Sequence, residues 1–340
     1  MAKSGHFALL LAFSLSSFAI LANLLGHWRN STKLIAGARN ATIGCFACLT
    51  IAVTVLWIAL VRSDFAVTYV AEHTSRALPL VFKLSALWAG ASGSLLLWLW
   101  MQTGFIVLVF HKCKDDEGAF SAGARGAANL VSAFFLLVLV FDQNPFAVST
   151  TIRPDGAGLN PMLQHPAMAL HAPILLISFA TLAVPFAWAF ASLKWDAAQG
   201  PAPLSRQARN WILPAWLFMT IGIVLRMWWG HEKLGPGGSR AWDPGQNFFL
   251  MPWLTATALL FCFRVSKRNP FSANLLFILS LITYSLCILG TFLPRSAPDS
   301  GVHAFPESEL GKPFLILLIH IWILAAILLW RKYRRLKEQT

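Results

Sequence analysis

The feature that most constrains this chain is a series of apolar runs, most of them long enough to cross a lipid bilayer as a helix. A transmembrane helix needs about 20 apolar residues, and 57% of the 340 residues are hydrophobic while only 12% are charged. A soluble domain carries about 25% charged residues, so a water-soluble globule is excluded, and so is a disordered chain. We mark nine runs, near residues 7–25, 41–61, 86–110, 126–141, 172–193, 211–229, 248–263, 271–293 and 313–330. The sequence therefore predicts an all-α, polytopic integral membrane protein with a single transmembrane domain over residues 1–340.

Positive charge is distributed unevenly between the loops. Three Lys or Arg residues lie in each of the loops 26–40, 111–125, 194–210 and 264–270, and five lie after Trp330. Because Lys and Arg gather on the cytoplasmic side of membrane proteins, these loops predict a cytoplasmic carboxyl terminus and an amino terminus outside. The same rule accounts for the net charge of +13 without nucleic acid as a partner. The first run lacks a small-residue cleavage site, which favours a retained helix over a signal peptide.

The loops on the outer side hold the residues with the most specific chemistry. These loops cover residues 62–85, 142–171, 230–247 and 294–312. They contain His73, His165, His171, His231 and His303. Long loops on a helical scaffold are where binding residues usually lie, so we expect the functional face to be the outer one.

Tryptophan is concentrated in the segment RMWWGHEKLGPGGSRAWDPGQNFFLMPWL, residues 226–254. Trp228 and Trp229 end one apolar run, and Trp242 and Asp243 precede the next. Tryptophans at a membrane surface are typical of an interfacial aromatic belt. Alternatively, they form a flat apolar platform suited to a planar macrocycle. Asp243 followed by proline is a typical helix start.

Two basic residues lie close to the ends of apolar runs. Lys83 precedes the third run, and Arg226 lies near the outer end of the sixth. Both side chains either snorkel to the interface or pair with the carboxylates of an anionic ligand. The sequence leaves both alternatives open.

The histidines offer candidate ligands for iron. His171 and His303 come from different outer loops, and two imidazoles on one face can serve as axial ligands. His165 and His231 are rival ligands on the same side. His320 lies in the middle of the last run, where a histidine either packs with a polar partner or has a function.

Several other chemistries find no support in the sequence. No phosphate-binding loop, dinucleotide fingerprint, H-E-x-x-H or nucleophile elbow is present. Cys45 and Cys48 form a C-x-x-C within an apolar run. That spacing reflects helix packing or, as a minor alternative, redox or metal chemistry.

Four stretches, in order along the chain, resemble the CcmF/NrfE/CcsA haem-handling family of cytochrome c maturation, closest to a shortened CcmF. SDFAVTYVAEHTSRALPLVFKLSALWAG resembles the first outer loop of the family and the helix after it. NPFAVSTTIRPDGAGLNPMLQHPAMALHAP resembles its Asn-Pro-Phe…His-Pro-Pro segment. WDPGQNFFLMPWLTATALL resembles the end of its tryptophan-rich signature, and SGVHAF resembles the segment with its second periplasmic histidine.

This resemblance implies a fold, a place and a function. The fold is a multi-pass helical bundle in the bacterial inner membrane, with its active face in the periplasm. The function is to bind haem b and present its vinyl groups to the Cys-x-x-Cys-His thiols of apocytochrome c, as part of a haem lyase system. The implied partners are apocytochrome c, a haem chaperone, thiol-reducing subunits, membrane lipid and a protein that carries the missing carboxyl-terminal CcmF helices.

The resemblance also implies site residues. His171 and His303 match the two periplasmic axial ligands of the haem iron. The surviving parts of the tryptophan-rich signature are Trp228, Trp229, Trp242 and Asp243.

The chain departs from the family pattern at several of these positions. The family has W-G-G-[WY]-W where this chain has Pro236-Gly237-Gly238-Ser239-Arg240, so residues 230–247 form a degenerate tryptophan-rich loop. Phe261 stands where CcmF has a transmembrane histidine. These departures support a second hypothesis, a non-catalytic CcmF-like paralogue that acts as a membrane assembly or interaction subunit and has lost haem binding.

Overall fold

The computed structural model describes residues 1–112, 119–150, 153–193, 209–234, 244–265, 271–296 and 311–339. Within them the chain forms an all-helical bundle, and no β-strand is found apart from one isolated bridge between Val67 and Val148. The long helices are α1 (Ala2–Trp28), α2 (Thr32–Arg62), α5 (Ala91–Lys112), α6 (Ala119–Phe141), α7 (Pro166–Ser192), α9 (Arg209–Leu234), α10 (Pro244–Val265), α11 (Phe271–Ser296) and α12 (Gly311–Gln339). The short ones are α3 (Thr68–His73), α4 (Leu80–Ser85), η1 (Ala86–Trp88) and η2 (Pro161–Leu163).

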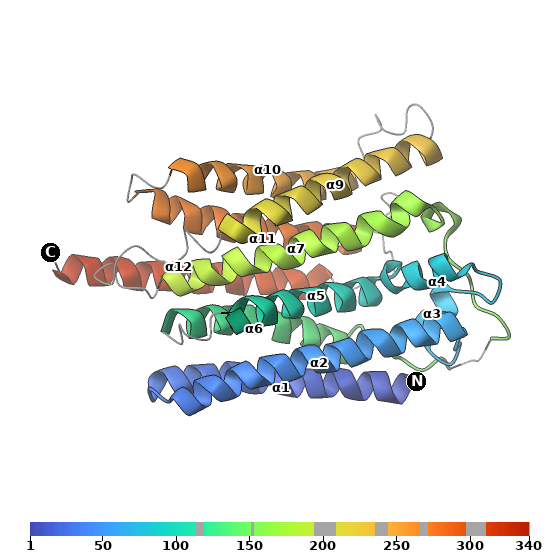
Figure 1. The fold of residues 1–340 in the computed structure, drawn as a ribbon, viewed down its shortest axis with the longest axis horizontal. Helices are drawn as coiled ribbons and strands as arrows, with labels where there is room; N and C mark the ends of the chain where they lie inside the picture. The colour runs from blue at the N-terminus through green and yellow to red at the C-terminus, as the bar shows by residue number, and fades with distance from the viewer. Residues whose placement is uncertain are drawn as a thin grey trace.

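The long helices run side by side along the longest axis of the molecule (Figure 1). In this view α1 and α2 form one flank, α9 and α10 form the other, and α5, α6 and α7 lie between them. The two termini lie at opposite ends of the bundle. Residues Ser178 to Ser192 of α7 are all buried, and α5, α6, α9 and α11 pack against this central helix.

The helices agree with a membrane protein. Seven of them are long and apolar enough to cross a bilayer, and the described parts of α10 and α11 hold shorter apolar stretches, Phe249–Phe263 and Leu275–Gly290. Each of the nine apolar runs marked in the sequence overlaps one long helix. The helical class is therefore confirmed, whereas the exact number of spans and the side on which each terminus lies stay predictions.

The fourth apolar run, residues 126–141, is shorter than its helix α6 because the run was marked to begin after Arg125. The sequence placed Arg125 in a cytoplasmic loop, but it lies within α6 with only 2% of its surface exposed. Helix α6 thus begins at Ala119, in a segment rich in Ala and Gly that an apolar-run criterion passes over. Arg125 consequently does not belong in the count of loop charges.

A chain of polar side chains ties three helices together inside the bundle. Tyr284 of α11 donates its hydroxyl hydrogen to Gln102 Oε1 of α5 at 2.5 Å. Gln102 Nε2 in turn donates to Ser132 Oγ of α6 at 3.3 Å. All three residues are buried, and hydrogen bonding is what makes buried polar groups tolerable in an apolar interior.

The segment before and through α3 and the segment after α6 fold against each other at the end of the bundle where the amino terminus lies (Figure 1). The main-chain amide of Thr68 donates to Ala147 O, and the amide of Ser149 donates to Ala66 O, both at 2.9 Å. Further along, the amide of Gly158 donates to Thr74 O at 3.1 Å. These bonds fasten the segment that leads into η2 and then α7, and so they set where α7 starts.

Candidate functional site

His171 lies at the contact between α7 and α9. Its ring is buried, with 3% of the residue exposed, and Nδ1 is 2.9 Å from the main-chain carbonyl oxygen of Gly222. A carbonyl oxygen only accepts, so Nδ1 carries the hydrogen and, in the neutral ring, Nε2 carries the lone pair. A histidine that binds a metal typically donates its other ring N–H to a carbonyl or carboxylate in this way. Phe249 of α10 packs edge-on against the ring, with centroids 5.7 Å apart.

Gly222 makes this contact possible by having no side chain. A Cβ atom at this position would lie 2.6 Å from Leu175 Cδ2 of α7, which is closer than such atoms pack. The glycine therefore lets the two helices approach until the His171 ring reaches the main chain of α9.

Arg226 lies one helical turn beyond Gly222. It is buried, and its guanidinium carbon lies 4.9 Å from the centroid of the Trp229 ring. An arginine over an indole face is a cation–π contact. The structure thus places Arg226 against an aromatic ring within the α7–α9 contact.

Trp228 and Trp229 have opposite environments although they are adjacent in the sequence. Trp229 is completely buried and donates from Nε1 to Met162 O at 3.0 Å. Trp228 is 47% exposed and donates from Nε1 to Glu232 Oε1 at 2.5 Å. Of these two indoles only Trp228 presents a large surface outward.

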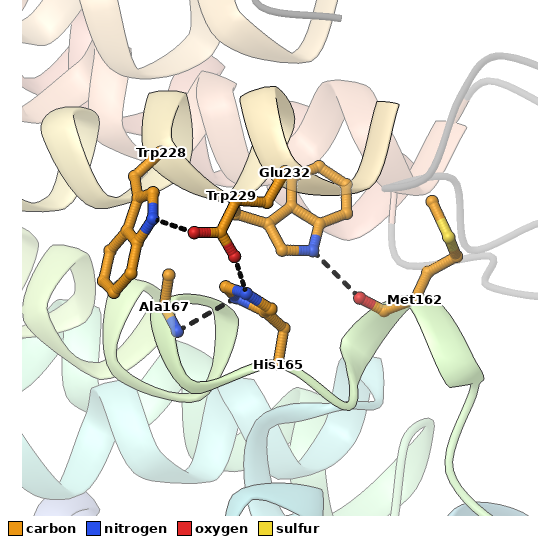
Figure 2. A network of polar contacts seen from close by, with 6 residues as sticks. All are labelled: Met162, His165, Ala167, Trp228, Trp229 and Glu232. Atoms are coloured by element: carbon orange, nitrogen blue, oxygen red, sulfur yellow. Dashed lines mark hydrogen bonds and ion pairs between the residues drawn. The ribbon is translucent and has the colours of Figure 1, made fainter. Parts of the chain in front are cut away.

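His165 caps the start of α7 and joins it to α9 (Figure 2). Its Nδ1 accepts the main-chain amide of Ala167 at 3.2 Å, and its Nε2 donates to Glu232 Oε2 at 2.7 Å. Figure 2 shows the Glu232 carboxylate between Trp228 and His165, with Trp229 reaching Met162 beside them. Glu232 was not among the candidate residues named from the sequence. The available signal was its spacing of four residues from Trp228, which puts both on one face of a helix.

The structure brings together part of the expected site. His171, Arg226, Trp228 and Trp229 all lie along the contact between α7 and α9. Trp242, Asp243 and His303 lie outside the described residues, as does the rest of the segment 235–243 of the loop 230–247. Among the described residues, no group of three or more His, Cys, Asp or Glu side chains is arranged to hold a metal ion.

The remaining candidates lie elsewhere. His231 is exposed at the end of α9. His320 is exposed on α12 and donates from Nδ1 to Ile316 O of its own helix at 2.7 Å. Lys83 donates to Ser63 Oγ at 2.9 Å. Cys45 and Cys48 are buried and free in α2, as expected of packing residues.

Comparison with known proteins gives consistent matches. A family model described as "Cytochrome C assembly protein" matches residues 88–301. The cytochrome c-type biogenesis protein CcmF of Haemophilus influenzae is 36% identical over 337 residues, which cover 97% of this chain and 51% of that protein. CcmF of Escherichia coli is 34% identical, with 97% and 51% covered. The cytochrome c-type biogenesis protein NrfE of Haemophilus influenzae is 33% identical, with 93% and 50% covered.

A solved structure shows the same fold. It is that of "Cytochrome c Heme Lyase CcmF", which superimposes with a TM-score of 0.80 at 29% identity. The match covers 97% of this chain and 51% of the other. The chain therefore spans about half the length of the relatives that it matches.

Proposed function

Because this chain belongs to the cytochrome C assembly protein family, we propose that it acts in cytochrome c maturation by binding haem b at a membrane face and presenting it for attachment to apocytochrome c. Its apolar helices and its CcmF relatives make it a bacterial membrane protein. We also propose that the protein lies in the inner membrane and that its site faces the periplasm. Its proposed partners are apocytochrome c, a haem chaperone, thiol-reducing subunits and a protein with the remaining CcmF helices.

The arrangement of His171 is the observation that carries this proposal. Its Nδ1 is held by the Gly222 carbonyl at 2.9 Å, so the ring is oriented by main chain and its Nε2 has the lone pair that a haem iron needs. We propose His171 as one axial ligand and His303 as the other.

Two neighbouring groups suit other parts of a haem molecule. Arg226 supplies a positive charge inside the same helix contact, and arginine pairs well with carboxylates such as the two propionates. Trp228 supplies an indole that is 47% exposed and suited to stacking against a flat ring system. Trp242 and Asp243 are assigned to the same site by their match to the tryptophan-rich signature.

The proposed reaction is addition of a cysteine thiol to a vinyl group. The sulfur forms the new carbon–sulfur bond, and the thiol hydrogen ends on the terminal vinyl carbon, so the bond forms without an oxidant or a reductant. The residues above bind and orient the macrocycle. The increase in rate would then come mainly from holding the vinyl group and the thiol close together in the right orientation, which is a proximity effect.

An absorbance spectrum of the detergent-purified protein tests the proposal. We expect a Soret band and, after dithionite reduction, sharp α and β bands of low-spin, bis-ligated haem. We expect His171→Ala to abolish these bands. His231→Ala tests whether the rival ligand His231 binds the haem iron instead. His27→Ala, at an exposed position of α1, is the control. Unchanged haem in His171→Ala would contradict the assignment of this ligand.

One sequence observation favours a second candidate function. The aromatic centre of the tryptophan-rich loop is replaced by Pro236-Gly237-Gly238-Ser239-Arg240, as in a paralogue that keeps the scaffold and serves as an interaction subunit. An apo spectrum that persists after haem is supplied and a full-length CcmF is coexpressed would favour this candidate. Co-purification with that CcmF would then identify the partner.

A further inference from the structure

Glu232 connects two aromatic side chains, Trp228 of α9 and His165 at the cap of α7 (Figure 2). Its Oε1 accepts from Trp228 Nε1 at 2.5 Å, and its Oε2 accepts from His165 Nε2 at 2.7 Å. Each carboxylate oxygen thus serves one donor, and bonds to an ionised acceptor belong to the stronger class. The side chain of Glu232 is 46% exposed, so it stands at the rim of the α7–α9 contact.

The position of His165 in the chain selects its tautomer. Because Nδ1 accepts the amide of Ala167 at the first turn of α7, that nitrogen carries the lone pair. The hydrogen of the neutral ring is then on Nε2, which faces Glu232. The helix cap and the link to Glu232 therefore require the same tautomer, and each supports the other.

Trp228 is the side chain that this arrangement holds in place. An exposed indole that is free to change rotamer loses conformational entropy when a ligand binds. Here the bond to Glu232 and the edge-on contact with His165, whose ring centroid is 5.8 Å away, restrict the rotamer before binding. The rotamer of Trp229 does not depend on Glu232, because burial and the bond to Met162 O already fix it.

Other contacts already hold the two helices together. Ser178 Oγ donates to Ala215 O at 2.7 Å, and His171 donates to Gly222 O at 2.9 Å. Exposed ion pairs add little to stability. The main effect of Glu232 is therefore on the orientation of Trp228 and not on the assembly of the bundle.

We propose that Glu232 is a positioning residue that holds Trp228 as a preformed stacking surface for a flat aromatic macrocycle. The proposal rests on the proposed function, because haem is the macrocycle. The residue acts through Trp228 and does not itself contact iron.

The experiment combines haem titration with an observation of Trp228 that needs no haem. The protein is labelled with 5-fluorotryptophan, and Trp228→Phe identifies the fluorine resonance of Trp228 among those of the fifteen tryptophans. We expect Glu232→Gln to shift and broaden that resonance, because a glutamine has only one acceptor oxygen for two donors. We expect haem affinity, measured from the Soret band, to fall about tenfold, which corresponds to ~1.4 kcal/mol.

Two variants separate positioning from helix capping. His165→Asn keeps a side chain that caps helices well, but its amide ends short of the position of His165 Nε2, so the bond to Glu232 is lost and both effects should recur in the same direction. Lys233→Ala, at the adjacent exposed position, is the matched control and should change neither. If Glu232→Gln does not fold, His165→Asn carries the test.

The outcomes distinguish the two proposals. An unmoved Trp228 resonance in Glu232→Gln overturns the positioning role, and so does a moved resonance with unchanged haem affinity. A wild-type protein that binds no haem removes the proposed function and, with it, the role of Glu232 in haem binding. Reduced affinity together with a displaced Trp228 supports both.

Discussion

The imidazole of His171 donates to the main-chain carbonyl of Gly222 across the contact between α7 and α9, at 2.9 Å. The acceptor belongs to the main chain, so no side-chain substitution on α9 deletes it. Its distance from the ring depends instead on how closely the two helices approach. A change in the separation of the helices is therefore the direct way to disturb this ring.

Gly222→Ala makes that change. The added Cβ would lie 2.6 Å from Leu175 Cδ2 and 2.7 Å from Leu175 Cγ, so the leucine must move or the helices must separate. We expect a loss of about 1–3 kcal/mol in the free energy of unfolding, as for other overpacked cores. We also expect weaker haem binding, measured by Soret titration.

Leu175→Ala in the same protein provides the control. The double variant removes the atoms that clash, so the two substitutions should be coupled favourably in a double-mutant cycle. Normal haem affinity and normal stability in Gly222→Ala would show that the helix separation does not set the His171 contact.

Gly93→Ala tests the turn at the start of α5. Its Cβ would lie 2.1 Å from Leu87 O and 2.3 Å from Tyr69 Oη. Tyr69 Oη donates to the carbonyl oxygens of η1 and accepts the amide of Gly90, so neither neighbour moves without losing hydrogen bonds. We expect a loss of about 3 kcal/mol or more, the range of severe substitutions, measured as a lower thermal midpoint in detergent.

Gly126→Ala is the matched control for that substitution. Gly126 also lies within a helix, but a Cβ there meets nothing within 4 Å. Replacing such a helical glycine should stabilise the protein by about 0.4–1 kcal/mol. Similar effects of the two alanines would contradict the contacts assigned to Gly93.

The sequence predicted the helical class well because a long apolar segment in a bilayer must satisfy its own main-chain hydrogen bonds, which a helix does. It predicted helix ends less well. The third run was marked from residue 86, but Ala86–Trp88 form η1 and α5 begins at Ala91. The difference arises from Tyr69, whose hydroxyl binds the carbonyls of Ala86 and Leu87. A contact between two residues 17 positions apart cannot be predicted from the hydropathy of an apolar run.

Candidate site residues could be named from the sequence where the residue type decides the chemistry. His171 and Arg226 were named from the sequence, and both lie at the α7–α9 contact. The different roles of Trp228 and Trp229 were not predictable, because adjacent helical residues point about 100° apart and only the packing of α7 decides which one is covered. Glu232 was missed for the same reason, since its importance comes from its bond to His165, which caps another helix.

His73 should remain neutral under mildly acidic conditions. Burial lowers its pKa below the ordinary 6.5, although the bond to Tyr69 O and the charge of Glu72 act in the opposite direction. Because the unfolded chain then binds the proton first as pH falls, the contribution of His73 to stability is complete above pH 6.5 and decreases below it. Ring carbon NMR, with His73→Asn for assignment, measures the midpoint. A midpoint at or above 6.5 would refute this prediction.

Tyr284→Phe tests the polar chain inside the bundle. It removes the hydroxyl that donates to Gln102 Oε1 at 2.5 Å and leaves a buried acceptor without that donor. An unsatisfied buried polar group costs about 1–3 kcal/mol, and we expect the free energy of unfolding to fall by that amount. Unfolding in mixed micelles measures it. Tyr333→Phe, at an exposed position of α12, is the control and should change stability by less than about 0.5 kcal/mol.

A second substitution separates the lost hydrogen bond from lost packing. Replacing both partners with apolar side chains of similar shape is close to neutral, because no polar atom is then left unsatisfied. Tyr284→Phe combined with Gln102→Leu should therefore be more stable than Tyr284→Phe alone, although Ser132 loses the donor that reaches it from Gln102. Its hydroxyl keeps a bond to Ala128 O at 3.1 Å, so that loss is small. Equal stability of Tyr284→Phe and the wild type would show that the Tyr284–Gln102 bond does not stabilise the fold.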